Sequence, residues 1–157
     1  MFQSLTLELD DLDKQILEVL KQDCSKSIRE VAKAVGKSPS LILKRVKRLY
    51  EAGLIRRCEA VLDYLKLGYG LMALTLFKVD GAHIEEVENV LAKEPRVRGV
   101  YDITGEYDIA IIAVFKDVAD LNSFIKKVLK NPYIKESVTS VIFKAVKDEI
   151  NIEYFAE

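Results

Sequence analysis

Positively charged side chains are concentrated in one short segment of this chain. Residues 38–58 carry six Lys or Arg residues against a single Glu, although the formal net charge of the whole chain is -1. Guanidinium and ammonium groups at this density suit a polyanion such as nucleic acid. Residues 63–157 do not share this charge, because they hold 12 basic and 16 acidic residues. The charge pattern therefore predicts two parts with different tasks, one of which binds a polyanion.

A second group of residues that could bind a ligand is the sequence TGEYD at 104–108. Gly105 allows backbone N–H groups to approach a carboxylate, and Asp108 could hold an ammonium group. Together these groups suit the zwitterion of an α-amino acid. An ordinary hairpin turn explains the same residues, and the residues alone favour that plainer interpretation. A later segment could add hydroxyl contacts from Ser137, Thr139 and Ser140.

The sequence contains no set of residues typical of catalysis or of a metal site. Its one histidine, His83, is interpreted as a capping or surface residue rather than a base. The phosphate-loop motifs G-x-x-x-x-G-K and G-x-G-x-x-G do not occur. Cys24 and Cys58 are too few for a zinc site, and we interpret them as reduced thiols, with a disulfide as the lesser alternative. We therefore expect no enzyme activity, no metal and no cofactor.

Three short helices in the first sixty residues are predicted to position the basic side chains. The first begins after Asp10 and carries Ile16 on its apolar face. Ser27 and Glu30 form a capping box for the second helix, which ends at Gly36. A Gly-Lys turn then leads to a third helix with proline at its first position. Two short helices joined in this way, the second of them basic, are typical of a helix-turn-helix that enters the major groove.

The third helix turns Ile42 and Val46 toward the core, which leaves its opposite face polar and cationic. Residues 54–63 (LIRRCEAVLD) then alternate like a strand and predict a wing that lies along phosphates. A solvated basic face is the plainer explanation of the charge, but the spacing of the helices favours DNA binding. The outer face of the helix holds Ser40, Lys44 and Lys47, flanked by Leu41 and Arg48, and the wing adds Arg56 and Arg57.

From about residue 70 the sequence predicts the element order βαββαβ. Strands are predicted over residues 71–80, 97–104, 107–115 and 137–147, and helices over 83–95 and 118–132. This is the order of a ferredoxin-like sandwich, whose two helices cover one face of an antiparallel sheet. Met72, Leu74 and Leu76 make the other face of the first strand apolar as well. An exposed apolar sheet is an association site, so we expect at least a dimer formed by sheet-to-sheet packing.

In combination these segments resemble the Lrp/AsnC (feast/famine) family of transcription regulators over essentially the whole length. The resemblance rests on LDDLDKQILEVLKQD, SIREVAKAVGKSPSLILKRVKRLYEAGLI, LDYLKLGYG, VYDITGEYDIAI and VTSVIFKAV, in this order. It implies an α+β chain with a three-helix, winged helix-turn-helix domain over residues 1–57 and a hinge or linker strand over 58–69. Residues 70–157 would form a ferredoxin-like domain that binds the effector and carries the oligomer contacts.

The resemblance also implies functional residues. It adds Ser38 to the DNA-facing set of the third helix and places Arg45 near the edge of the core. Leu43 stands at a position that is often polar in the family, and Tyr64 stands where many members have proline, which predicts a more pliable hinge. Dimers of such proteins assemble into octamers or other assemblies. The effector, a small amino acid bound between effector domains, would contact Thr104, Gly105, Glu106, Tyr107, Asp108, Ser137, Thr139 and Ser140.

The sequence thus predicts a cytoplasmic, sequence-specific transcription regulator that binds double-stranded DNA and a free amino acid. No apolar run approaches the roughly 18 to 20 residues that span a bilayer, and the N-terminus lacks the layout of a signal peptide, so we expect no membrane contact. Two alternatives stay open at this point. One is an architectural DNA-compacting protein without an effector, and the other is a regulatory subunit of a metabolic enzyme.

Overall fold

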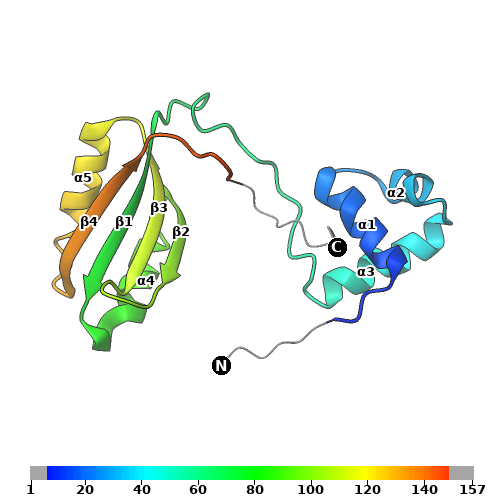
Figure 1. Ribbon diagram of the computed structural model, residues 1–157, viewed down its shortest axis with the longest axis horizontal. Coiled ribbons are helices and arrows are strands. Elements are labelled where there is room, and N and C mark those ends of the chain that lie inside the picture. The colour runs from blue at the N-terminus through cyan, green and yellow to red at the C-terminus, as the bar shows by residue number, and fades with distance from the viewer. Residues whose placement is uncertain (1–6, 149–157) are drawn as a thin grey trace. The chain divides into compact units, whose positions relative to one another are not determined.

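The computed structural model describes residues 7–148, which form two compact units (Figure 1). The first unit contains the described residues up to Val61, and the second runs from Leu62 to Asp148. Among the described residues, no helix has the length and apolar character needed to span a membrane.

The first unit contains three helices, which confirms the sequence prediction. They are α1 (Asp11–Gln22), α2 (Ile28–Val35) and α3 (Pro39–Glu51). Ser27 and Glu30 form the expected capping box of α2, and Asp10 forms a second one with Asp13 at the start of α1. The conformation at the end of α2 requires glycine, since Gly36 has a φ of 65°. The helices enclose a core of Ile16, Val31, Ala32, Ile42, Val46 and Leu49.

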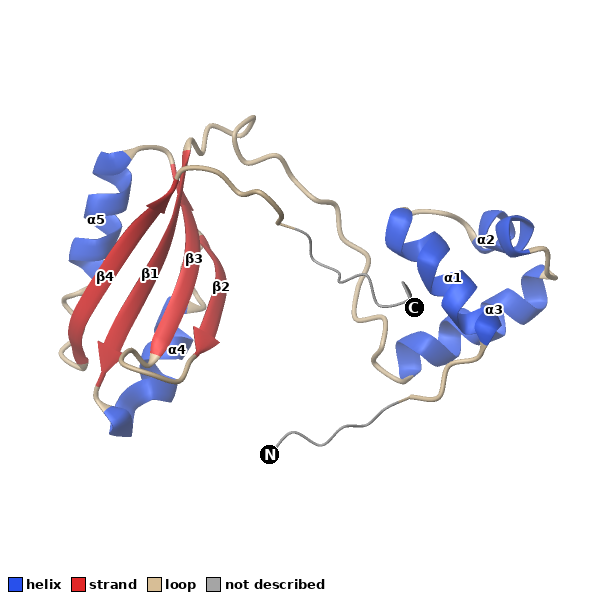
Figure 2. Ribbon diagram, viewed as in Figure 1, coloured by secondary structure: helices blue, strands red, loops and turns tan. Residues whose placement is uncertain are grey.

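No strand follows α3 before Leu71, so the predicted strand over residues 54–63 is wrong for the single chain (Figure 2). A strand is held by ladder hydrogen bonds to a neighbour. None of the described strands pairs with these residues, so alternation alone does not make them a strand. The predicted linker strand over 58–69 likewise contains only a turn, at residues 64–68.

Tyr64 anchors that turn. Its carbonyl accepts a hydrogen bond from the backbone N–H of Tyr69 at 2.9 Å, and the two rings meet edge to face with centroids 6.4 Å apart. The guanidinium of Arg98 lies 5.2 Å from the centroid of the Tyr64 ring, which is a cation–π distance. Tyr64 therefore lies against strand β2 (Val97–Asp102), and the pliability expected of the hinge stays a prediction.

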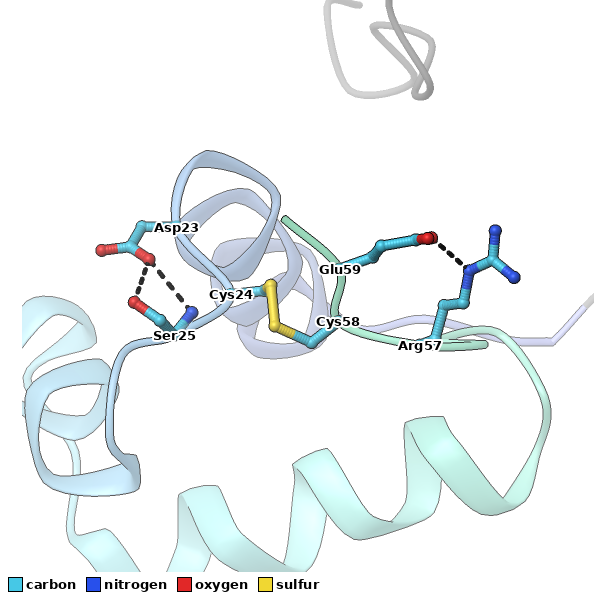
Figure 3. Close-up of a disulfide and its surroundings, with 6 residues drawn as sticks. All are labelled: Asp23, Cys24, Ser25, Arg57, Cys58 and Glu59. Carbon is cyan, nitrogen blue, oxygen red and sulfur yellow. Dashed lines mark hydrogen bonds and ion pairs between the residues drawn. A yellow bond between two sulfur atoms is a disulfide. The ribbon is translucent and has the colours of Figure 1, made fainter. Parts of the chain in front are cut away.

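The two cysteines form a disulfide, which joins the turn after α1 to the segment after α3 (Figure 3). The expectation of reduced thiols is wrong. Cys24 and Cys58 are 34 positions apart in the sequence, yet the fold brings their Cα atoms to 5.6 Å, within the range of disulfides. Sequence separation gives no information on this distance, because it depends on how α1 and α3 pack.

The second unit is a four-stranded antiparallel sheet with the strand order β2-β3-β1-β4. Its order along the chain confirms the predicted ferredoxin-like βαββαβ sandwich, with one short 3-10 turn added. The elements are β1 (Leu71–Val79), the turn η1 (Gly81–His83), α4 (Ile84–Leu91), β2, β3 (Ile109–Phe115), α5 (Val118–Val128) and β4 (Ile134–Ile142).

One face of this sheet packs on α4 and α5. Its hydrophobic core joins Phe77 and Phe115 of the sheet to Val87 of α4 and Phe124 of α5. The opposite face, called the outer sheet face below, is formed by the alternate residues of the same strands, because side chains alternate along a strand. The strand register places these apolar residues on it: Met72, Leu74, Leu76, Tyr101, Ala110, Ile112, Val114, Val138 and Ile142.

Candidate DNA interface and effector loop

The exposed side of α3 carries polar and basic side chains, as predicted. Ser38 caps the helix by accepting a hydrogen bond from the Leu41 N–H, and its hydroxyl lies 3.3 Å from that of Ser40. Lys44 is exposed, and the side chain of Lys47 is 72% exposed. Lys47 pairs only loosely with Glu51 one turn away, at 3.6 Å. An exposed pair of this kind is weak, so it leaves the ammonium group of Lys47 accessible to a ligand. The ammonium group of the exposed Lys44 is accessible as well.

Two other cations of α3 point to carboxylates of α1 instead. Arg45 Nη1 donates to Asp10 Oδ2 at 2.5 Å and to Asp13 Oδ1 at 3.2 Å. Arg48 Nη2 donates to Asp13 Oδ2, and Asp13 has no exposed surface. The backbone N–H of Asp13, followed by Arg45, holds the pKa of Asp10 below its usual value. The pKa of Arg45 is raised, mainly by its hydrogen bond to Asp10.

Sequence reasoning missed this ion cluster. From the sequence, the helix dipole is enough to explain Asp10 and Asp13, because it favours carboxylates at a helix N-terminus. A signal was present, because Asp13 precedes Ile16 by three residues and therefore shares the buried face of α1. A carboxylate on a buried face needs a cation, and α3 supplies two.

The predicted wing residues lie in the irregular segment after α3. Arg56 and Arg57 are both exposed. Arg57 Nε donates to Glu59 Oε2 at 2.5 Å, beside the disulfide (Figure 3). Leu43 is 56% exposed on α3, whereas Leu41 is half-buried.

The loop TGEYD connects β2 to β3 and contains the predicted effector residues. Thr104, Gly105 and Glu106 are exposed, and Gly105 has a φ of 123°. The carboxylate of Asp108 is already used within the fold, since its Oδ2 accepts a hydrogen bond from the backbone N–H of Val79 at 2.7 Å. Asp108 thus fastens the loop to the end of β1.

The predicted β4 residues are divided between the two faces of the sheet. Tyr107 of the loop donates a hydrogen bond to Glu136, which brings Ser137 to the same end of the sheet. Burial, followed by the nearby Glu136, raises the pKa of Tyr107. The hydroxyl of Thr139 lies 3.0 Å from that of Thr75 on the helix-covered side. Ser140 is opposite Leu74 on the outer sheet face, so Thr139 and Ser140 do not face one common site.

The fold and these two sites define a class of protein, the DNA-binding regulators that carry a separate ligand-binding domain. Residues 9–56 match the winged helix-turn-helix DNA-binding model, and residues 72–152 match the Lrp/AsnC ligand binding domain. The chain belongs to the Lrp/AsnC family of transcriptional regulators.

Similar proteins cover nearly the whole chain. An uncharacterised HTH-type transcriptional regulator of Pyrococcus horikoshii is 40% identical over 147 residues, which are 94% of this chain and 99% of that protein. The HTH-type transcriptional regulator FL11 of Pyrococcus furiosus is 36% identical, over 89% of this chain and 93% of its own. A transcriptional regulator of Neisseria meningitidis, solved as a complex with L-Met, superposes with a TM-score of 0.86 at 28% identity, over 92% and 96% of the two chains.

Proposed function

We propose that this regulator recognises specific sequences of double-stranded DNA through α3 and the irregular segment after it. The observation that carries the proposal is the exposed cationic side of a capped helix that follows a second short helix across a glycine turn. Lys44, Lys47, Arg56 and Arg57 would supply the electrostatic affinity. Ser38, Ser40 and Leu41, at the start of α3, would lie where recognition helices contact base edges.

Replacing both Arg56 and Arg57 by Ala should weaken binding to all DNA sequences about equally, because phosphate contacts carry no sequence information. The log–log salt slope of binding should fall by about 0.9 for each phosphate that the variant no longer neutralises. Fluorescence anisotropy with a specific and a random duplex at several salt concentrations measures both effects. The double variant Lys126→Ala/Lys130→Ala removes the same charge from exposed positions of the second unit and should change neither. A loss limited to one DNA sequence would contradict the phosphate role.

We further propose that a free amino acid binds at the loop TGEYD and tunes DNA binding or assembly. The family's ligand-binding domain supports this proposal, as does the L-Met complex of the Neisseria protein. The backbone around Gly105 would receive the carboxylate of the ligand, and Asp108 would face its ammonium group. The effector acts only through a difference in its affinity for two states of the assembly.

A thermal-shift screen against the twenty amino acids tests the effector site. A ligand of the native state should raise the Tm, by roughly 10 °C at about a hundred times its Kd. Asp108→Asn should abolish this rise, because it removes the charge but keeps an oxygen that can accept the hydrogen bond from Val79. The variant must melt near the wild-type Tm without ligand, which Asp108→Ala would not ensure.

A second candidate function is that of an architectural DNA-binding protein without an effector. The hydrogen bond that already occupies Asp108 favours this candidate, because it explains the aspartate without a ligand. If none of the twenty amino acids shifts the Tm, the loop is only a turn and the architectural function replaces the sensor.

Assembly of the chain belongs to the same proposal. The outer sheet face carries apolar side chains from all four strands, and we propose a second copy of this chain as its occupant. Closed symmetry would allow further assembly to an octamer or a similar oligomer.

A further inference from the structure

Asp13 is the only charged side chain that is fully buried among residues 7–148. Its Oδ1 and Oδ2 each accept a hydrogen bond from Arg45 Nη1 at 3.2 Å, and Oδ2 also accepts one from Arg48 Nη2. The backbone N–H of Asp10 donates to the same Oδ2 at 3.2 Å. The carboxylate therefore has donors on both oxygens, and two of its partners come from the helix that faces DNA.

A buried carboxylate makes these contacts hard to give up. Removing one partner from a buried ion pair costs far more than removing one from an exposed pair, because an uncompensated charge is left in a poorly solvated place. A phosphate that drew Arg48 outward would leave Asp13 with Arg45 as its only guanidinium partner. Arg45 is also shared, since it pairs with Asp10 as well.

The four cations of α3 thus fall into two classes that the sequence does not distinguish. Lys44 and Lys47 are exposed, and the only carboxylate paired with either among the described residues is Glu51 on the same helix. The side chains of Arg45 and Arg48 are 25% and 44% exposed, and their guanidinium groups connect α3 to the first turn of α1.

We propose that Asp13 is a positioning residue that holds Arg45 and Arg48 within the domain and so fixes the orientation of α3 on α1. On this proposal, which rests on DNA binding by α3, Lys44 and Lys47 are the cations of that helix that neutralise phosphates. Arg45 and Arg48 determine where these lysines lie and do not themselves release counterions.

The salt dependence of DNA binding by the full chain separates the two classes. Lys44→Gln should reduce the log–log salt slope by about 0.9, the value for one phosphate contact. Arg48→Gln, one helical turn away, should leave the slope unchanged and lower the affinity by the same factor at all salt concentrations. It should also lower the Tm of the first unit by on the order of 10 °C, because it leaves the buried Asp13 with fewer partners. A slope reduced by about 0.9 in Arg48→Gln, with an unchanged Tm, would overturn the proposal.

A thermal double-mutant cycle of Asp13→Asn and Arg48→Gln keeps the inference testable without DNA. The decrease in Tm of the double variant should be smaller than the sum of the decreases in the two single variants. Each single variant leaves a charge without its partner, and the double variant removes that charge too. Additive losses would overturn the positioning role. Failure of the wild-type chain to bind any duplex would refute the proposed function instead, and the cycle would still decide the role of Asp13.

Discussion

Reduction of the Cys24–Cys58 disulfide is expected to lower the free energy of unfolding of the first unit by about 4 kcal/mol. The bond closes a loop that spans 34 positions and includes all of α2 and α3. In the chain-entropy model a loop of this length restricts the unfolded chain enough to contribute that amount. Since a whole domain is stable by only about 5 to 15 kcal/mol, the expected loss is a large fraction of the total.

Chemical denaturation with and without a thiol reductant measures this loss. The matched control is Cys24→Ser/Cys58→Ser, which should unfold like the reduced wild type and should not respond to reductant. Thiol titration of the native chain gives an independent count of free cysteines. Equal denaturation midpoints in both conditions, together with two free thiols, would show that the chain folds without this bond.

The position of the disulfide also connects stability to DNA binding. Cys58 directly follows Arg56 and Arg57, in a segment without regular secondary structure. Beyond the backbone itself, the bond is the covalent connection between this segment and the end of α1. The oxidised chain therefore presents the two arginines from a restrained segment, so that less conformational entropy would be lost in the phosphate contacts that we propose for them.

The elements that were predicted correctly depend on local signals. The capping box of Ser27 and Glu30 requires only residues three positions apart, and the apolar run that predicts β1 lies within its nine residues. The Asp108 loop was located for the same reason, since a glycine turn between two apolar runs indicates a hairpin. These signals were enough to predict both domains and the loop of the candidate effector site.

The features that could not be predicted depend on contacts between distant parts of the chain. The disulfide and the Asp13 cluster both require the packing of α1 against α3, which the pattern of either helix does not contain. The bond from Val79 to Asp108 exists because β1 lies beside β3 in the sheet. The strand expected over 54–63 is absent for a related reason. A strand needs hydrogen bonds to a neighbouring strand, whereas alternation is a property of one segment alone.

Leu74→Asp is expected to convert the wild-type assembly into a folded monomer. Leu74 lies on β1, an inner strand, opposite Ile112 of β3, and both residues belong to the outer sheet face. In the monomer this position is half-buried at the surface, so a carboxylate there can still reach water and the unit should fold. In a dimer that buries the face, each copy would place an unpaired charge against apolar side chains. The dissociation constant should rise by a factor on the order of 1,000 or more.

Sedimentation equilibrium of the wild type and the variant measures the change in mass. Val118→Asp is the matched control, because it introduces the same carboxylate at a 67% exposed apolar residue of α5, which is not part of the outer sheet face, and should leave the mass unchanged. An unchanged mass for Leu74→Asp would place the subunit contact elsewhere. If the wild type is itself a monomer, the proposal that a second copy covers the outer sheet face is refuted. Loss of assembly in Leu74→Asp but not in Val118→Asp would assign subunit pairing to the outer sheet face. An effector bound near the loop TGEYD would then act on a partner subunit through this surface.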